Sequence, residues 1–151
     1  MRRTRLLKFF SLALCLATLT PMLRADILAI GTWVRRPNKD GGSSTMFIET
    51  AGTGRKLTFK VPIAGGGITT MIVTTQLDGK DAPVLVDGKP SGETMAIRLM
   101  DDRHAVNVIK MNGNEWLTQK SELSVDGKVI KVESTPAVSG GQYGTEYWDK
   151  K

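Results

Sequence analysis

The chain has 151 residues, enough for a single domain, with 24% charged and 40% hydrophobic residues and a formal net charge of +6. Five of the 21 basic residues and none of the 15 acidic ones lie in the first 25 positions, which leaves 16 basic residues against 15 acidic ones elsewhere. This near-neutral remainder argues against nucleic-acid binding, which needs a basic surface.

The first 25 residues have the three-part pattern of a secretory signal peptide. A basic segment, Met1–Lys8, precedes the uncharged apolar run Phe9–Leu19, and the pattern ends at Ala25. The apolar run has 11 residues, whereas a membrane-spanning helix needs about 20, so a retained anchor is disfavoured. We therefore expect a signal-peptide helix within residues 1–25, and a domain over 26–151 in the periplasm or outside the cell.

The single cysteine, Cys15, lies inside the apolar run. The exported domain is therefore expected to have neither a disulfide nor thiol chemistry. Lipidation of Cys15 is a disfavoured alternative, because Leu14 occupies a position where lipoprotein processing needs a small residue. The pair Arg2-Arg3 leaves a twin-arginine signal open, although the residues that follow fit ordinary secretion better.

The exported segment is predicted to open with a strand around Gly31-Thr32-Trp33, which follows the apolar run Ile27–Ile30. A glycine allows two backbones to approach closely, and a large indole can fill one end of a small barrel. Beyond this strand, β-prone runs alternate with glycine-containing turns, and no long helical periodicity is present. This pattern is typical of an all-β fold built from hairpins.

Short turns connect the remaining predicted strands. Arg55–Ile63 alternates apolar and polar side chains, so one face must be buried. Pro83 excludes a central ladder position for the short piece around it, and Asn112-Gly113 is a strong hairpin signal because both residues accept positive φ. In chain order, with 87–92 as a loop, the predicted strands are Thr45–Thr50, Arg55–Ile63, Ile68–Leu77, Ala82–Val86, Glu93–Met100, His104–Met111, Asn114–Ser124, Val129–Thr135 and Gln142–Asp149.

Sequential hairpins without crossover helices predict one topology. We expect a single antiparallel up-and-down β-barrel of eight to ten strands, because closing the meander removes its two exposed edges. The interior of such a barrel can remain partly unfilled, which turns a core face into a pocket lining.

The strand Gly31-Thr32-Trp33, placed after a signal peptide and before a meander, resembles the opening of the calycin barrels: lipocalins, fatty-acid-binding proteins and avidins. The segments 77–84, 93–98, 124–128 and 147–150 are similar to lipocalin-like exported bacterial proteins of unassigned function. The resemblance implies a barrel around a small hydrophobic or amphipathic ligand. It also implies a basic residue packed on Trp33, for which the candidates are Arg98, Lys131 and Lys150.

Eight side chains are predicted to lie in the barrel interior and to contact any ligand. Trp33 is interpreted first as an end plug and second as a ligand contact. The alternative is a structural or interaction protein of the cell envelope, with a filled barrel and no ligand. The predicted interior residues are Trp33, Phe59, Val61, Met71, Ile97, Leu99, Trp116 and Tyr147.

No catalytic residue, metal site or cofactor is predicted. His104 is the only histidine, and the acidic residues nearest to it, Asp101-Asp102, belong to the same turn, where neighbouring side chains diverge. No nucleophile is spaced to serve this group. The run Gly65-Gly66-Gly67 lacks the lysine of a phosphate-binding loop and joins two strands. We therefore expect a non-enzymatic protein, and the oligomeric state stays open.

Overall fold

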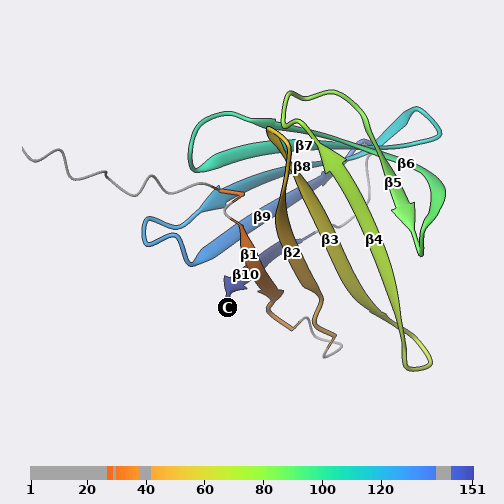
Figure 1. The fold of residues 1–151 in the computed structure, drawn as a ribbon, viewed down its shortest axis with the longest axis horizontal. Helices are drawn as coiled ribbons and strands as arrows, with labels where there is room; N and C mark the ends of the chain where they lie inside the picture. Colours follow the sequence, from red (N-terminus) through yellow and green to blue (C-terminus); the bar gives the residue numbers. More distant parts are fainter. Residues whose placement is uncertain (1–26, 29, 38–41, 139–143) are drawn as a thin grey trace, which may run out of the picture.

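Ten antiparallel strands wrap around one axis in the computed structural model of the chain (Figure 1). The structure describes residues 27–28, 30–37, 42–138 and 144–151. Each strand pairs with its successor, and β1 pairs with β10, so the sheet has no free edge. The strands are β1 Gly31–Arg35, β2 Thr45–Ala51, β3 Gly54–Ile63, β4 Gly67–Thr75, β5 Ala82–Val86, β6 Lys89–Leu99, β7 His104–Met111, β8 Asn114–Leu123, β9 Val129–Pro136 and β10 Thr145–Lys150.

This topology confirms the predicted all-β fold, a single antiparallel up-and-down barrel, with ten strands. The barrel closes where β1 and β10 run side by side, with Trp33 opposite Lys150 (Figure 1). The predicted signal peptide and its helix, residues 1–25, lie outside the described residues, as does the start of the last predicted strand, Gln142–Asp149.

The sixth strand begins earlier than the sequence pattern indicates. β6 starts at Lys89 rather than at the predicted Glu93, because Asp87 and Gly88 alone make the turn that precedes it. Their φ angles are 48° and 78°, the positive values that a two-residue hairpin turn requires. The expected loop over 87–92 is therefore wrong, and β5 and β6 form a tight hairpin.

Pro83 lies inside β5 but is paired on one side only. On the β6 side it lies opposite Thr94, next to a register shift between Pro83 and Leu85. On the β4 side the pairing covers only Val84–Val86. A proline has no backbone N–H to donate, so a position with a single neighbour is one that it can occupy.

The two ends of the barrel are packed differently. We call the end at which β1 begins and β10 finishes the plugged end; Ile27 and Leu28 lie there, directly before β1. The opposite end carries the β3–β4, β5–β6 and β7–β8 turns. Fully buried large side chains gather toward the plugged end, so the solid core occupies that half of the barrel. They are Trp33, Ile27, Ile48, Leu123, Val73 and Val84.

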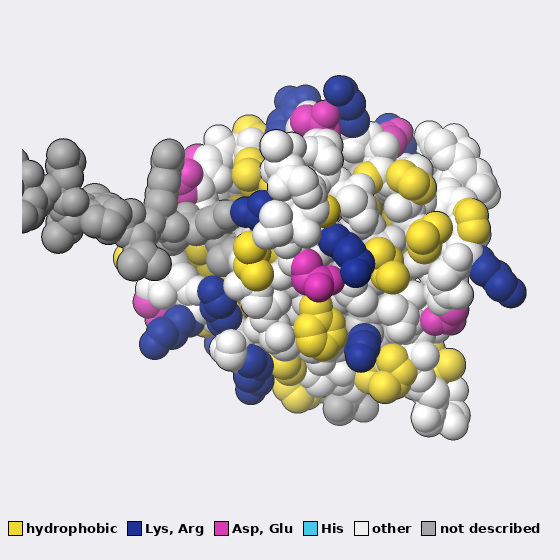
Figure 2. Space-filling model, in the orientation of Figure 1, with side chains coloured by type: hydrophobic (Ala, Val, Ile, Leu, Met, Phe, Trp, Pro, Cys, Tyr) yellow, Lys and Arg dark blue, Asp and Glu magenta, His cyan; other side chains and the backbone are white. Residues whose placement is uncertain are grey.

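The outer surface carries charges of both signs. Figure 2 shows one face, on which lysine and arginine side chains lie among acidic and hydrophobic ones. Several of these charges pair across neighbouring strands, as in Lys56 with Glu49 at 3.1 Å and Arg36 with Asp149 at 2.8 Å. Exposed pairs of this kind contribute little stability individually, so the fold depends on its interior.

Candidate functional site

An internal cavity of about 240 Å³ lies within the barrel. Every strand except β5 contributes to its wall, which is mainly apolar. An engineered apolar cavity of about 150 Å³ is large enough to take up benzene. The space in this barrel therefore suits a small organic molecule. Apolar side chains of the wall include Leu57, Phe59, Val61, Met71, Ile97 and Trp148.

Ile27 and Leu28 form the floor of this cavity at the plugged end. Both side chains are buried and belong to the cavity wall. The amide of Ile27 donates to the carbonyl of Asp102 at 2.8 Å, and Arg55 Nε donates to the carbonyl of Leu28 at 3.1 Å. These two residues precede the first strand and are bonded to the β6–β7 turn and to β3.

Trp33 is packed where the barrel closes and does not line the cavity. Its side chain is 0% exposed, and Lys150 Nζ lies 5.5 Å from the centroid of its ring. Of the three candidates for the basic residue on Trp33, Lys150 is the one in contact. Gly31 permits this arrangement, because a Cβ at that position would lie 3.3 Å from Lys150 Cε. The position of Trp33 agrees with an end plug rather than with a ligand contact.

The structure brings four of the eight predicted interior residues together around the cavity. Phe59 and Val61 come from β3, Met71 from β4 and Ile97 from β6. Phe59 meets Trp148 edge to face, with ring centroids 6.2 Å apart. This aromatic pair fixes one side of the wall, since edge-to-face contacts are favourable.

Leu99 and Tyr147 do not line the cavity. Leu99 shares the inner face with Ile97 but is the last residue of β6, and it is 37% exposed at the plugged end. Tyr147 is 38% exposed because its neighbour Trp148 takes the inward position. Its ring instead lies under the Arg36 guanidinium, 5.1 Å from the centroid.

Trp116 also lies outside the cavity wall, and a register shift explains why. Ile109 pairs with Leu117 and Lys110 pairs with Glu115, so Trp116 is an extra residue between two matched pairs. An extra residue of this kind interrupts the inward-outward alternation of a strand. Trp116 is half-buried and packs against the edge of the core.

One ion pair belongs to the cavity wall, and no local sequence pattern predicts it. Arg35 Nη1 lies 2.7 Å from Glu146 Oε1, and both side chains are only partly exposed. The two residues come from β1 and β10, close to the opposite end of the barrel. Within the described part of the chain they are the only charged side chains of the wall, so it holds one charge of each sign.

A row of polar side chains crosses the wall on β7, β8 and β9. Asn107 Nδ2 donates to Gln119 Oε1 at 3.2 Å, and Gln119 Nε2 donates to Ser134 Oγ at 3.3 Å. Asn107 and Gln119 both line the cavity. Alternation could have found Asn107, because it lies between Ala105 and Ile109 on the buried face of its strand.

His104 is the first residue of β7 and lies beside the solvent-exposed β6–β7 turn at the plugged end. The Asp101 carboxylate accepts hydrogen bonds from the amides of Arg103 and His104, and it lies 2.8 Å from His104 Nδ1. These contacts, the Arg103 amide foremost, hold the pKa of Asp101 below its ordinary value. The described residues include no group of three or more potential ligands that could hold a metal ion.

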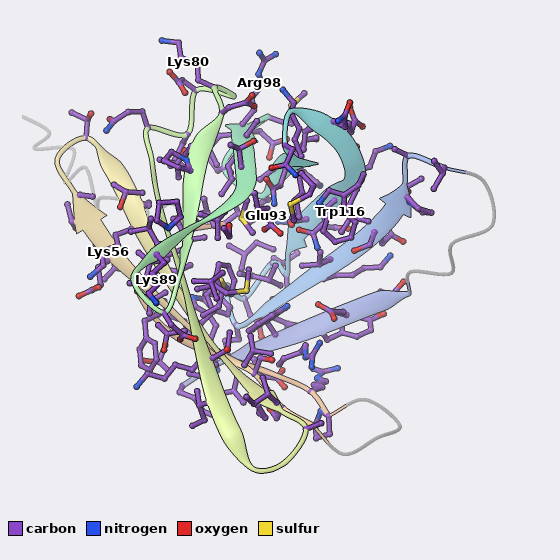
Figure 3. All side chains as sticks on the ribbon, turned by 90° about the vertical axis from the view of Figure 1, so that its right-hand side faces the viewer. Lys56, Lys80, Lys89, Glu93, Arg98 and Trp116 are labelled. Atoms are coloured by element: carbon purple, nitrogen blue, oxygen red, sulfur yellow. The ribbon has the colours of Figure 1, made fainter. Side chains whose placement is uncertain are left out.

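Besides Glu146 on β10, a second acidic residue occupies an inward-facing position. This residue is Glu93, on β6. Figure 3 shows Glu93 and Trp116 within the body of the barrel, whereas Lys80 and Arg98 project from its surface. Partial burial raises the pKa of the Glu93 carboxyl above its ordinary value. Glu93 is not part of the cavity wall, and we assign it no role in ligand contact.

The described part of the molecule is thus a closed ten-stranded antiparallel barrel with an internal, mainly apolar cavity. Comparison with known proteins finds no matching family model, no matching curated protein and no matching solved structure. Within the described ranges, no helix has the length and apolar character that crossing a membrane demands.

Proposed function

We propose that the chain is an exported, lipocalin-like binding protein that holds a small hydrophobic or amphipathic molecule inside its barrel. The observation that carries the proposal is the cavity of about 240 Å³ with a mainly apolar wall. Small-molecule sites are concave and mostly apolar, with a few polar groups that set orientation. The wall has this composition, since Arg35, Asn107, Gln119 and Glu146 are polar among apolar neighbours.

The closing strands support the lipocalin-like part of the proposal. Lipocalin barrels, as the resemblance implies, open with a Gly-x-Trp strand whose tryptophan is covered by a basic residue. Here Gly31, Trp33 and Lys150 form such a group between the first and last strands. The proposal assigns no catalytic role, and His104 is an exposed residue at the start of β7, outside the cavity wall.

An apolar fluorescent dye tests directly whether the barrel cavity binds a small molecule. The dye 1-aminonaphthalene, which has two fused rings and is uncharged at pH 7, is expected to bind the purified protein with enhanced emission. It should also quench tryptophan emission, because Trp148 is in the wall. Val61→Trp, which places an indole in the cavity, should abolish dye binding, whereas Ile68→Trp on an exposed position should leave it unchanged. Mass spectrometry of an organic extract of the protein should detect a co-purified small molecule.

A folded protein that takes up no dye and carries no extractable molecule would contradict the container. The barrel would then be structural, with loops that meet a partner in the cell envelope. Equal dye binding by the wild-type protein and Val61→Trp would place the dye on the surface, and would equally contradict the proposal. Far-UV circular dichroism of each variant verifies that the barrel is folded.

A further inference from the structure

Two polar atoms of wall residues are shielded from solvent and have no hydrogen-bond partner: Arg35 Nε and Asn107 Oδ1. The first can only donate a hydrogen bond, and the second can only accept one. Leaving a buried donor or acceptor unmatched carries a free-energy cost. Neither atom is exposed to the cavity, so a bound molecule that offers a polar group recovers that cost once a side-chain rotation turns the atom toward it.

The charges in the wall restrict which polar group is acceptable. Arg35 and Glu146 neutralise each other at 2.7 Å, so the wall has no net charge to attract an ion. A ligand carboxylate near Arg35 meets the Glu146 carboxylate, and a ligand ammonium near Glu146 meets the Arg35 guanidinium. Like charges at close range in a partly desolvated site are strongly unfavourable. Either ion also loses its hydration on entering a mainly apolar cavity.

The size of the cavity restricts the rest of the ligand. A volume of about 240 Å³ exceeds that of a benzene-binding cavity, about 150 Å³, by a modest amount. One or two fused rings fit these limits, whereas an extended acyl chain exceeds them.

We infer that the cavity selects an uncharged molecule of one or two rings that carries a hydroxyl group, and that Glu146 is the residue that excludes anions. A hydroxyl both donates and accepts, so it can bond Asn107 Oδ1 or Arg35 Nε. This inference rests on the proposed function, because it specifies the ligand class of the same cavity.

Four naphthalene probes that differ only in one substituent test the selectivity. Naphthalene, 2-naphthol, 2-naphthoate and 2-naphthylmethylammonium are titrated into the purified protein at pH 7 by calorimetry and by quenching of Trp148 emission. The expected order places 2-naphthol about tenfold or more tighter than either ion, and tighter than naphthalene. Equal affinity for 2-naphthol and 2-naphthoate overturns the inference while leaving the container intact. If none of the four probes binds, the proposed function of the cavity as a binding site is contradicted as well.

Glu146→Gln tests the residue assigned to anion exclusion. The variant leaves Arg35 with an uncompensated charge, so 2-naphthoate should bind about tenfold tighter than to the wild-type protein, with 2-naphthol changed less than about threefold. The matched control is Glu133→Gln, because Glu133 pairs with Lys131 on the outer surface at 2.7 Å and does not line the cavity. This control should bind every probe as the wild-type protein does.

A second variant keeps the test decisive if Glu146→Gln fails to fold. Arg35→Gln combined with Glu146→Gln removes both charges and leaves no buried unpaired ion. It should retain 2-naphthol and gain nothing for 2-naphthoate. A gain for 2-naphthoate in the double variant, or the absence of a gain in a folded Glu146→Gln protein, contradicts the role of Glu146.

Discussion

Replacing Trp33 tests the structural basis of barrel closure. Its side chain is 0% exposed and packs under Lys150, at the pairing of β1 with β10. Truncating a buried aromatic residue to alanine costs about 3–5 kcal/mol, and the cation–π contact accounts for about 0.5–1 kcal/mol of that. We expect Trp33→Ala to lower the free energy of unfolding by about 4 kcal/mol, a large share of the 5–15 kcal/mol that typically stabilises a domain.

Equilibrium urea unfolding followed by far-UV circular dichroism measures this loss without depending on tryptophan emission. The control is Ile30→Ala, whose side chain is 55% exposed and whose loss should stay within about 0.5 kcal/mol. Combining Trp33→Ala with Lys150→Met in a double-mutant cycle should give a coupling of about 0.5–1 kcal/mol. A loss below about 1 kcal/mol for Trp33→Ala would refute the role assigned to this residue.

Three further substitutions probe other features of the barrel. Ile27→Ala should lower the free energy of unfolding by about 2–5 kcal/mol and enlarge the cavity, as measured by urea unfolding and by uptake of a larger dye. Gly54→Ala should destabilise by about 3 kcal/mol or more, because its Cβ would lie 2.0 Å from the carbonyl oxygen of Thr75; a melting temperature within a few degrees of wild type would contradict this. Burial raises the pKa of Glu93 above its ordinary 4.5, so the stability linked to its protonation is full below that pH and is lost as pH rises through the raised value. Glu93→Gln should flatten the decline in stability as pH rises above 4.5, and an unchanged profile would show that Glu93 does not contribute to it.

Local patterns were sufficient to predict the fold and most of the strands, although not the start of β6. Alternation in Arg55–Ile63 identified the inward face that carries Phe59 and Val61, and positive-φ residues at Asn112-Gly113 identified a hairpin. These signals are short-range, because a strand exposes its two faces with a period of two residues. The repeated hairpins then left closure as the way to remove the edges, which the pairing of β1 with β10 confirms.

Features that depend on a break in periodicity or on distant pairs could not be predicted. The register shift that displaces Trp116 arises between two strands, and neither strand alone indicates it. The Arg35–Glu146 pair joins residues 111 positions apart, and the local sequence around either residue does not indicate its partner. Ile27 and Leu28 have the composition of a strand, yet hydrogen bonds to a turn and to a neighbouring strand set their place.

Pairing of the first strand with the last has a consequence for how the chain acquires its structure. Trp33 meets Lys150 only after the final strand is available, so the contact that completes the barrel spans nearly the whole of the strand-forming part of the chain. Contacts between such distant positions form slowly, since a long loop must be ordered first. Until then the edge of β1 that faces away from β2, and the growing end of the meander, remain unpaired. The protein is most prone to aggregate during this interval.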